Sequence, residues 1–270
     1  MNNPFDWFDG IFVINLKRSA DRLVKFKHQA EEYDFIHKLE VFEAIEDEVG
    51  SYGCSCSHNE ILKIAKKRGM KNVLVFEDDA TFLYPKKYVH EELLKMISFL
   101  MNEEWNILYL GPNITWSNHT IISVQNDVVK CEKALGRFAI CYNDTCFDYF
   151  LNKFPNRKDF IRNPTQLRGD VIVSKSPLIK YSLRYPVCAP SSEETFTSVE
   201  ARKSLNKPSH DGYFHFLLIV GGYFSNKMIN MLRLREDIRQ KIYSDYNDVI
   251  NNIKATGFKS VIISKLRGLK

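Results

Sequence analysis

The stretch NVLVFEDDATF, residues 72–82, decides the fold, because an apolar segment in it runs directly into three acidic residues. Such an apolar run predicts a core strand. The similar run IFVINL (11–16) predicts a strand that is buried on both faces, as in a parallel sheet. The acids that follow NVLVF are Glu77, Asp78 and Asp79. Three adjacent carboxylates repel one another and resist burial. Something in the folded protein must therefore offset their charge at the end of this strand.

Strands and helices alternate through the first 111 residues, and this order favours a mainly parallel α/β sheet. Apolar residues recur at helical spacing after the first strand, again near 88–102, and most clearly in SHNEILKIAKKRG (57–69). Ser57 is expected to cap that helix, with Glu60 closing a capping box, and Gly69 to end it. The expected strands are IFVINL (11–16), KLEVFEAI (38–45), NVLVFED (72–78) and NILYLG (106–111).

The pattern changes after residue 111. Short β-type segments lie near turn residues, which predicts an antiparallel addition to the sheet. A helix is expected at 144–154 and a polar loop at 155–167. Loop-like sequence returns at 185–212. The short segments are TIISV (120–124), DVVKCE (127–132) and GRFAICYN (136–143).

The end of the chain is basic and differs from the rest. From Tyr223 onwards it carries 10 Lys and Arg against 4 Asp and Glu, a charge of +6, which leaves about −1 for the body. From about residue 226 the pattern predicts one or two amphipathic helices. We therefore expect a catalytic-type domain over 1–222 and a basic amphipathic helical tail over 223–270. A nucleic-acid-binding core would itself be basic, so no nucleic acid partner is expected.

Composition limits the class of protein further. The chain has 270 residues, 44% of them hydrophobic, which is enough for a well-buried core. No stretch approaches the roughly 18 apolar residues of a membrane span, and we expect a cytoplasmic protein with free cysteine thiols. Cys54 and Cys56 form a C-x-C pair. No second pair lies at zinc-ribbon spacing, so a structural zinc is not favoured.

The acidic triplet suggests a ligand site. In open α/β sheets, ligands bind beyond the carboxyl ends of the strands. Oxygen ligands suit Mg²⁺ or Mn²⁺, and these ions typically bridge carboxylates to a diphosphate. The triplet therefore favours a metal–nucleotide site, and solvated acids that cap a turn are the alternative. The chain contains neither a Walker A motif nor G-x-G-x-x-G, so an ATPase and a Rossmann dehydrogenase lose their main support.

Polar residues after the first strand are expected at the same edge of the sheet. Asn15, Arg18 and Arg22 follow that strand. Arginine is suited to phosphate because its planar fork donates two hydrogen bonds at once. For Arg22, a solvated position on the first helix is the alternative.

Four motifs in this order resemble a known family. FVINLKRSADR, FEAIED, GCSCSH and VLVFEDDATF, within residues 11–83, are similar to glycosyltransferase family 25, which includes lipooligosaccharide and procollagen galactosyltransferases. A looser likeness continues through GRFAICYNDTCFDYFL and RGDVIV to YPVCAP. The resemblance implies a GT-A-type mixed sheet and inverting transfer of a hexose, galactose or glucose, from a UDP-sugar. The acceptor would be a hydroxyl on a glycan, a lipid-linked glycan or a hydroxylated protein.

The resemblance also implies roles for single residues. Asp79 would be the direct ligand of a Mn²⁺ or Mg²⁺ ion. Asp78 or Glu77 would hold a metal-bound water or the ribose or sugar of the donor. His58 would face the diphosphate, and a solvent-facing position is the alternative. For Ser57, a role as the helix cap is the alternative to contact with the donor. The residues placed around the donor are Asn15, Arg18, Arg22, Ala44, Asp47, Ser57 and His58.

Two late residues complete the expected site. Asp170, in LRGDVIV, matches an aspartate of the family and is the candidate base that takes the acceptor's proton. An N-cap of a short helix at 171–175 is the alternative for it. Enzymes with a GT-A fold often recruit a late histidine to the metal, and His210 suits this role better than His215, which lies among aromatic residues.

Two other functions stay open. A nucleotidyltransferase would also use two carboxylates and Mg²⁺, but it predicts a glycine-rich loop after the first strand, and KRSADR contains no glycine. A degenerate transferase would serve as a nucleotide-sugar-binding or scaffold protein. The basic tail fits a solvated face packed on the body, peripheral contact with an anionic membrane, an acidic partner or a homo-oligomer contact.

Overall fold

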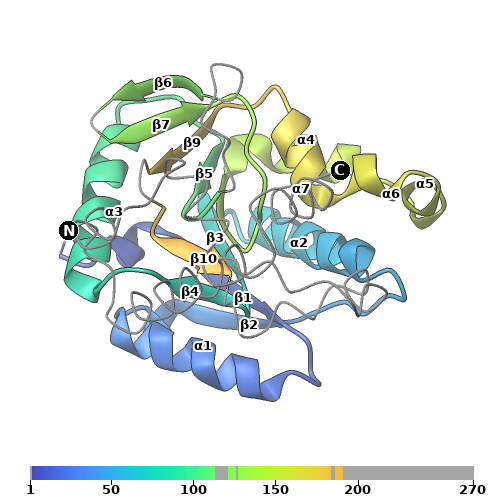
Figure 1. Ribbon diagram of the computed structural model, residues 1–270, viewed down its shortest axis with the longest axis horizontal. Helices are drawn as coiled ribbons and strands as arrows, with labels where there is room; N and C mark the ends of the chain where they lie inside the picture. The colour runs from blue at the N-terminus through green and yellow to red at the C-terminus, as the bar shows by residue number, and fades with distance from the viewer. Residues whose placement is uncertain (1, 113–120, 126, 184–185, 191–270) are drawn as a thin grey trace, which may run out of the picture. The chain divides into compact units, whose positions relative to one another are not determined.

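The computed structural model describes residues 2–112, 121–125, 127–183 and 186–190, which form a mixed α/β structure (Figure 1). Its main sheet has eight strands in the order β2-β1-β3-β8-β5-β9-β7-β6, and β4 pairs with β10 in a second sheet. The strands are β1 (Gly10–Asn15), β2 (Leu39–Glu43), β3 (Asn72–Glu77), β4 (Ala80–Phe82), β5 (Ile107–Tyr109), β6 (Ile121–Gln125), β7 (Val128–Cys131), β8 (Ala139–Asn143), β9 (Lys180–Leu183) and β10 (Cys188–Pro190).

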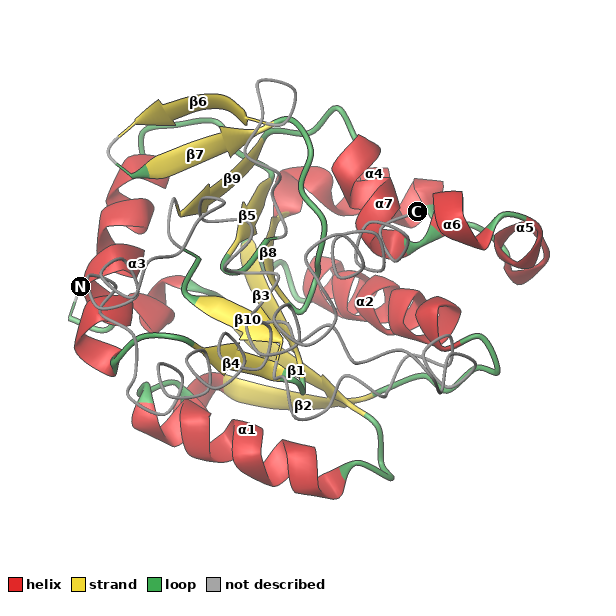
Figure 2. Ribbon diagram, viewed as in Figure 1, coloured by secondary structure: helices red, strands yellow, loops and turns green. Residues whose placement is uncertain are grey.

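Helices connect and cover these strands, as Figure 2 shows. The α-helices are α1 (Ala20–Glu32), α2 (Gly50–Lys67), α3 (Lys86–Leu100), α4 (Phe147–Lys153), α5 (Arg157–Arg162), α6 (Pro164–Leu167) and α7 (Gly169–Lys175). Short 3₁₀ helices are η1 (Pro4–Trp7), η2 (Ile36–Lys38) and η3 (Asp144–Cys146).

Strand directions confirm the expected GT-A-type mixed sheet. β1 pairs in parallel with both β2 and β3, and β9 pairs in parallel with β5. β8 lies between β3 and β5 and pairs antiparallel with both, and β7 pairs antiparallel with β9 and β6. The parallel N-terminal half is therefore as predicted. The predicted tail over 223–270 lies outside the described residues.

Both faces of the sheet are covered. In Figure 1, α1 and α3 lie on one side of the sheet, and α2, α4 and α7 lie on the other. All six residues of β1 are buried, so the expected double-sided burial is confirmed. On the α2 side, Phe12 packs in a core cluster with Ile61 and Val75. On the α1 side, Phe76 lies against Phe26 at a ring-centroid distance of 5.2 Å. Burial of each such side chain stabilises the fold by about 1.5–3 kcal/mol.

Two expectations about elements were wrong, and one short strand was missed. Helix α2 begins at Gly50, well before Ser57, because GSYGCS is helical despite its glycines. Ser57 therefore lies inside the helix and does not cap it. The stretch 155–167 contains α5 and α6 rather than only a loop, with the Asn156 side chain capping α5 through Asp159 N at 3.0 Å. The short strand β4, directly after the acidic triplet, was not expected.

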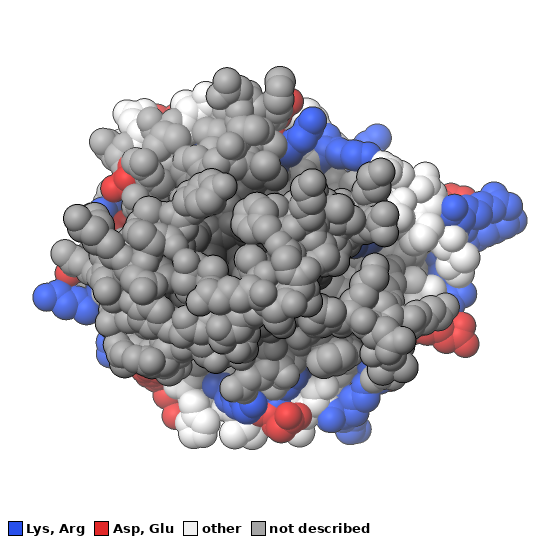
Figure 3. All heavy atoms as spheres, in the orientation of Figure 1, with Lys and Arg blue, Asp and Glu red and all other residues white. Residues whose placement is uncertain are grey.

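Surface properties agree with the composition. In the view of Figure 3, described Lys and Arg side chains are interspersed with Asp and Glu around the rim rather than gathered into one patch. All six cysteines are free thiols, as predicted. Within the part of the chain that the structure describes, no helix combines the length and the apolar character needed to cross a membrane.

Candidate functional site

A cleft of about 460 Å³ lies at the edge of the sheet where β1, β2 and β3 end and β8 begins. This volume falls in the range of small-molecule sites, and the position is the one where open α/β sheets bind ligands. Its walls also include the first part of α2 and the start of α7. The predicted residues that line it are Arg18, Arg22, Ala44, Asp47, Glu77, Asp78, Asp79 and Asp170.

Asp78 is buried and held by side chains from β1 and α1. Its Oδ2 accepts a hydrogen bond from Asn15 Nδ2 at 2.6 Å, and its Oδ1 accepts one from Arg22. The strand register explains why Asn15 and Asp78 meet. Ile14 of β1 pairs with Glu77 of β3, so the residues that follow them, Asn15 and Asp78, lie side by side. Burial raises the pKa of Asp78, and Arg22 and Asn15 oppose that rise. Asn15, predicted to touch the donor, instead orients Asp78.

Asp79 lines the cleft, and one of its carboxylate oxygens is not used by any described residue. Its Oδ1 is buried and has no hydrogen-bond partner among the described residues. Burial, together with the negative charges of Glu77 and Asp78, raises the pKa of Asp79 to about 7. A cation next to Oδ1 would offset both the burial and the repulsion.

Glu77 points toward α2. Its Oε1 accepts a hydrogen bond from Cys54 Sγ at 3.4 Å and lies 3.5 Å from His58 Nε2. Burial opposes the charge of Glu77, but His58 and Arg137 outweigh it and lower the pKa of this carboxyl. Burial and the nearby Glu77 raise the pKa of Cys54 well above its ordinary value, so Cys54 is a neutral thiol near pH 7.

His58 lies behind Glu77 and not in the cleft. Its side chain is only 2% exposed, and its Nδ1 lies 3.2 Å from the Tyr142 hydroxyl. Burial, followed by the charge of Arg137, lowers the pKa of His58 to about 4, so the ring is neutral near pH 7. The expectation that His58 begins the helix and faces diphosphate or solvent was therefore wrong.

Ser57 and Gly53 position the loop after β2. Ser57 Oγ accepts from Ile45 N at 2.8 Å and donates to Gly53 O at 3.0 Å. A Cβ added at Gly53 would lie 2.4 Å from the Ile45 carbonyl oxygen, so glycine is required for this close approach. The loop places Ala44 and Asp47 in the cleft wall. Ser57 thus acts through the loop and does not line the cleft.

Two ion pairs lie at the rim of the cleft. Asp47 accepts from Arg157 Nε at 2.7 Å and from Val49 N at 2.8 Å. The hydrogen bond from Arg157 outweighs burial and lowers the pKa of Asp47. Arg18 pairs with Glu46 at 2.8 Å, and these side chains are 57% and 55% exposed. Arg18 is therefore accessible to an anionic ligand, whereas Asp47 is already paired with Arg157 at the start of α5.

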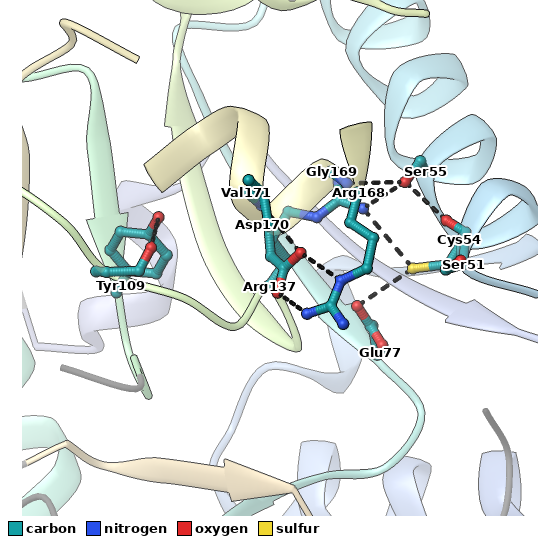
Figure 4. A network of polar contacts seen from close by, with 11 residues as sticks. Ser51, Cys54, Ser55, Glu77, Tyr109, Arg137, Arg168, Gly169, Asp170 and Val171 are labelled. Atoms are coloured by element: carbon teal, nitrogen blue, oxygen red, sulfur yellow. Dashed lines mark hydrogen bonds and ion pairs between the residues drawn. The ribbon is translucent and has the colours of Figure 1, made fainter. Parts of the chain in front are cut away.

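A second polar network joins α2 to α7 (Figure 4). Arg137, which precedes β8, donates from Nη2 to Ser55 Oγ at 3.1 Å. Ser55 Oγ also accepts from Gly169 N at 3.2 Å and donates to Ser51 O at 2.8 Å. A Cβ added at Gly169 would lie 2.1 Å from Arg137 Cζ, so the missing side chain makes room for the guanidinium. The network holds a positive charge in the cleft wall.

Asp170 lies in the first turn of α7 and is held by Arg168. Arg168 donates from Nε to Oδ1 at 3.2 Å and from Nη2 to Oδ2 at 2.8 Å. Oδ1 also accepts from Val171 N at 2.9 Å. The helix begins at Gly169, so Asp170 is not its N-cap. Its carboxylate lines the cleft in a fixed orientation, and Oδ2 keeps acceptor capacity for a further donor.

The sequence did not predict several residues that line the walls of the cleft. One predicted site residue cannot be placed. His210 is outside the described residues. Arg137 precedes an antiparallel strand, whose first residue, not its last, lies at the cleft edge. A prediction that followed only strand carboxyl ends therefore passed over it. The missed residues that line the cleft and join these networks are Cys54, Ser55, Arg137, Arg168 and Gly169.

The acidic residues were tested for their fit to a divalent ion. The partnerless, buried Oδ1 of Asp79 fits a hard cation, because carboxylate oxygen is the donor that Mg²⁺ and Mn²⁺ prefer. Asp78 fits less well, because Asn15 and Arg22 already contact both of its oxygens. The structure therefore favours Asp79 over Asp78 as the ligand, and Asp78 as the residue that fixes the end of β3.

Comparisons with known proteins add a weak likeness. No family model matches the chain. It is similar to a putative glucose-1-phosphate thymidylyltransferase from Bacillus anthracis, at 12% identity and a TM-score of 0.38, over 83% of this chain and 82% of the other. It is also similar to a glycosyltransferase involved in the glycosylation of the major capsid of PBCV-1, at 12% identity and a TM-score of 0.32, over 64% of this chain and 92% of the other. A UDP-glucose pyrophosphorylase complexed with UDP-glucose matches at 9% identity and a TM-score of 0.37, over 64% of this chain and 72% of the other. All three TM-scores are below 0.5, and we draw no conclusion about function from them.

Proposed function

We propose that the protein is a metal-dependent inverting glycosyltransferase that moves a hexose, galactose or glucose, from a UDP-sugar to a hydroxyl acceptor. The observation that carries the proposal is Asp79, which lines the cleft and whose buried Oδ1 has no hydrogen-bond partner among the described residues. The resemblance of four sequence motifs to glycosyltransferase family 25 supports the choice of reaction. The acceptor would be a glycan, a lipid-linked glycan or a hydroxylated protein.

The chain's own residues divide the work of such a reaction. A bound Mn²⁺ or Mg²⁺ would supply positive charge for the leaving diphosphate. Asp79 would hold the ion, and the exposed guanidinium of Arg18 would contact the diphosphate at the rim. Arg137 would add fixed positive charge in the wall. Asp170, oriented by Arg168, would take the proton of the attacking hydroxyl.

A thermal-shift panel tests the site. Nucleoside diphosphates and UDP-sugars are added with and without Mn²⁺ to the wild type, to Asp79→Ala and to a control, Asp148→Asn. The control alters an exposed carboxylate on α4, 67% exposed. We expect Mn²⁺-dependent stabilisation by one nucleotide in the wild type and the control, and its loss in Asp79→Ala. No shift with any nucleotide in the wild type would contradict the site and favour a scaffold.

Product analysis separates the proposal from a nucleotidyltransferase. A transferase releases a nucleoside diphosphate when a UDP-sugar and a hydroxyl acceptor are supplied. A nucleotidyltransferase releases pyrophosphate from a nucleoside triphosphate and a sugar phosphate. We expect UDP release and no pyrophosphate. The reverse result would replace the proposed reaction but keep the metal site.

A further inference from the structure

We propose that Cys54, His58 and Glu77 form a site for a soft divalent cation of the Zn²⁺ class, distinct from the hard-cation site at Asp79. We refer to these three residues as the Cys–His–Glu cluster. Two of them come from one face of α2, because positions four apart in a helix lie one above the other. The third ends β3.

Two of the three separations between the donor atoms already suit a tetrahedral ion. Cys54 Sγ lies 3.4 Å from Glu77 Oε1, and His58 Nε2 lies 3.5 Å from the same oxygen. All three donors lie within 4.8 Å of one another. Zinc bonds of about 2.0–2.3 Å at tetrahedral angles place neighbouring donors about 3.3–3.7 Å apart. Two of the three separations therefore need almost no movement.

His58 supplies an independent indication of a ligand. Its Nε2 is buried, lies 3.5 Å from Glu77 Oε1 outside hydrogen-bond geometry, and has no other polar partner within the described residues. Its other ring nitrogen lies 3.2 Å from the Tyr142 hydroxyl. A phenol can accept as well as donate, so Tyr142 can hold a ring that binds a cation through Nε2 and donates from Nδ1. Such an outer contact is usual for histidines that bind metal.

The chemistry of the donors selects the class of ion. A thiolate, an imidazole and a carboxylate are the ligands of Zn²⁺, whereas Mg²⁺ and Mn²⁺ prefer oxygen. Arg137 Nη2 lies 3.9 Å from Cys54 Sγ. Binding of the ion would release the proton of the Cys54 thiol to solvent. A dication bound by the resulting thiolate and one carboxylate carries no net charge, so this guanidinium does not oppose it. Cys54 and Glu77 both line the cleft, which gives the ion a path of entry.

Cobalt serves as the spectroscopic probe, and the chain offers a matched control. Co²⁺ is added to the reduced full-length protein without nucleotide, so the outcome is independent of the proposed transferase activity. Cys56, the control residue, is partly exposed on the same helix but is not part of the cluster. We expect a thiolate-to-cobalt charge-transfer band in the wild type and in Cys56→Ser, and none in Cys54→Ser. Competition with a chromophoric chelator should show at least about a 100-fold loss of Zn²⁺ affinity in Cys54→Ser.

Alkylation of the wild type gives a second readout that needs no variant. Bound Zn²⁺ should slow modification of Cys54 and leave that of Cys56 unchanged, as followed by peptide mass spectrometry. Absence of a cobalt band in the wild type, a band that persists in Cys54→Ser, or equal alkylation of Cys54 with and without Zn²⁺ would each overturn the proposal.

Discussion

Two flanks of the cleft are built in different ways. The carboxylate flank, Glu77, Asp78 and Asp79, comes from one continuous stretch at the end of β3. The arginine flank consists of Arg137 and Arg168 and comes from segments that are far apart in the sequence. Arg168 is already paired with Asp170, while Asp79 keeps an oxygen that accepts no hydrogen bond from a described residue. The first flank is therefore prepared to receive a cation, and the second supplies fixed positive charge.

The largest expected change in the free energy of unfolding is at Asp78, and it distinguishes Asp78 from Asp79. In Asp78→Asn, the amide offers only one oxygen to two buried donors, Asn15 and Arg22, and the charge facing Arg22 is lost. Removal of one partner of a buried ion pair typically costs about 3–5 kcal/mol. We expect that loss here, because the two poorly matched donors cost more than is gained by no longer burying the charge of Asp78, whose pKa burial raises. Urea unfolding measures it. A free energy of unfolding within about 1 kcal/mol of the wild type would show that Asp78 does not hold the flank together.

The same substitution at Asp79 should have the opposite sign. In metal-free protein the pKa of Asp79 is about 7, well above its value of about 4 in the unfolded chain. Between these values the folded state binds a proton that the unfolded state lacks, so the wild type loses stability as pH rises through the window. Asp79→Asn removes that loss and should be more stable by about 2–4 kcal/mol at pH 8, with no gain near pH 4.

Urea unfolding in a chelator at several pH values tests the Asp79 prediction. The control is Asp148→Asn, an exposed carboxylate whose replacement should show no such pH dependence. A gain for Asp79→Asn that is the same at pH 5 and pH 8 would mean that repulsion within the triplet is not its source.

A smaller effect tests the arginine flank. Ser55→Ala removes the oxygen that accepts from Arg137 Nη2 and Gly169 N, which leaves two donors without it. We expect a loss of about 1–3 kcal/mol in urea unfolding. Ser51→Ala is the matched control, because the Ser51 hydroxyl has no hydrogen-bond partner in the described part of the chain. Equal losses in the two variants would contradict the network.

The contrast between the flanks also explains what the sequence could predict. An apolar strand followed by three acidic residues is a local signal, so β3 and the carboxylate flank could be predicted from neighbouring residues in the sequence. Arg137 reaches the cleft only because β8 runs antiparallel, and strand direction is a property of the whole sheet. Ser57 was placed in a helix cap because the preceding glycines and serines concealed two turns of α2. Gly53 packs against Ile45 O within this helix, and local propensity does not describe such a contact.

The smallest expected change in stability belongs to Arg18, and it separates binding from folding. Its pair with Glu46 is more than half exposed, and exposed pairs contribute little. Arg18→Ala should therefore alter the free energy of unfolding by less than about 0.5 kcal/mol. If Arg18 contacts the diphosphate, the Mn²⁺-dependent thermal shift with the nucleotide should still decrease. Glu46→Gln breaks the same pair but keeps the arginine, so an equal decrease in that control would assign the effect to the pair and not to the positive charge.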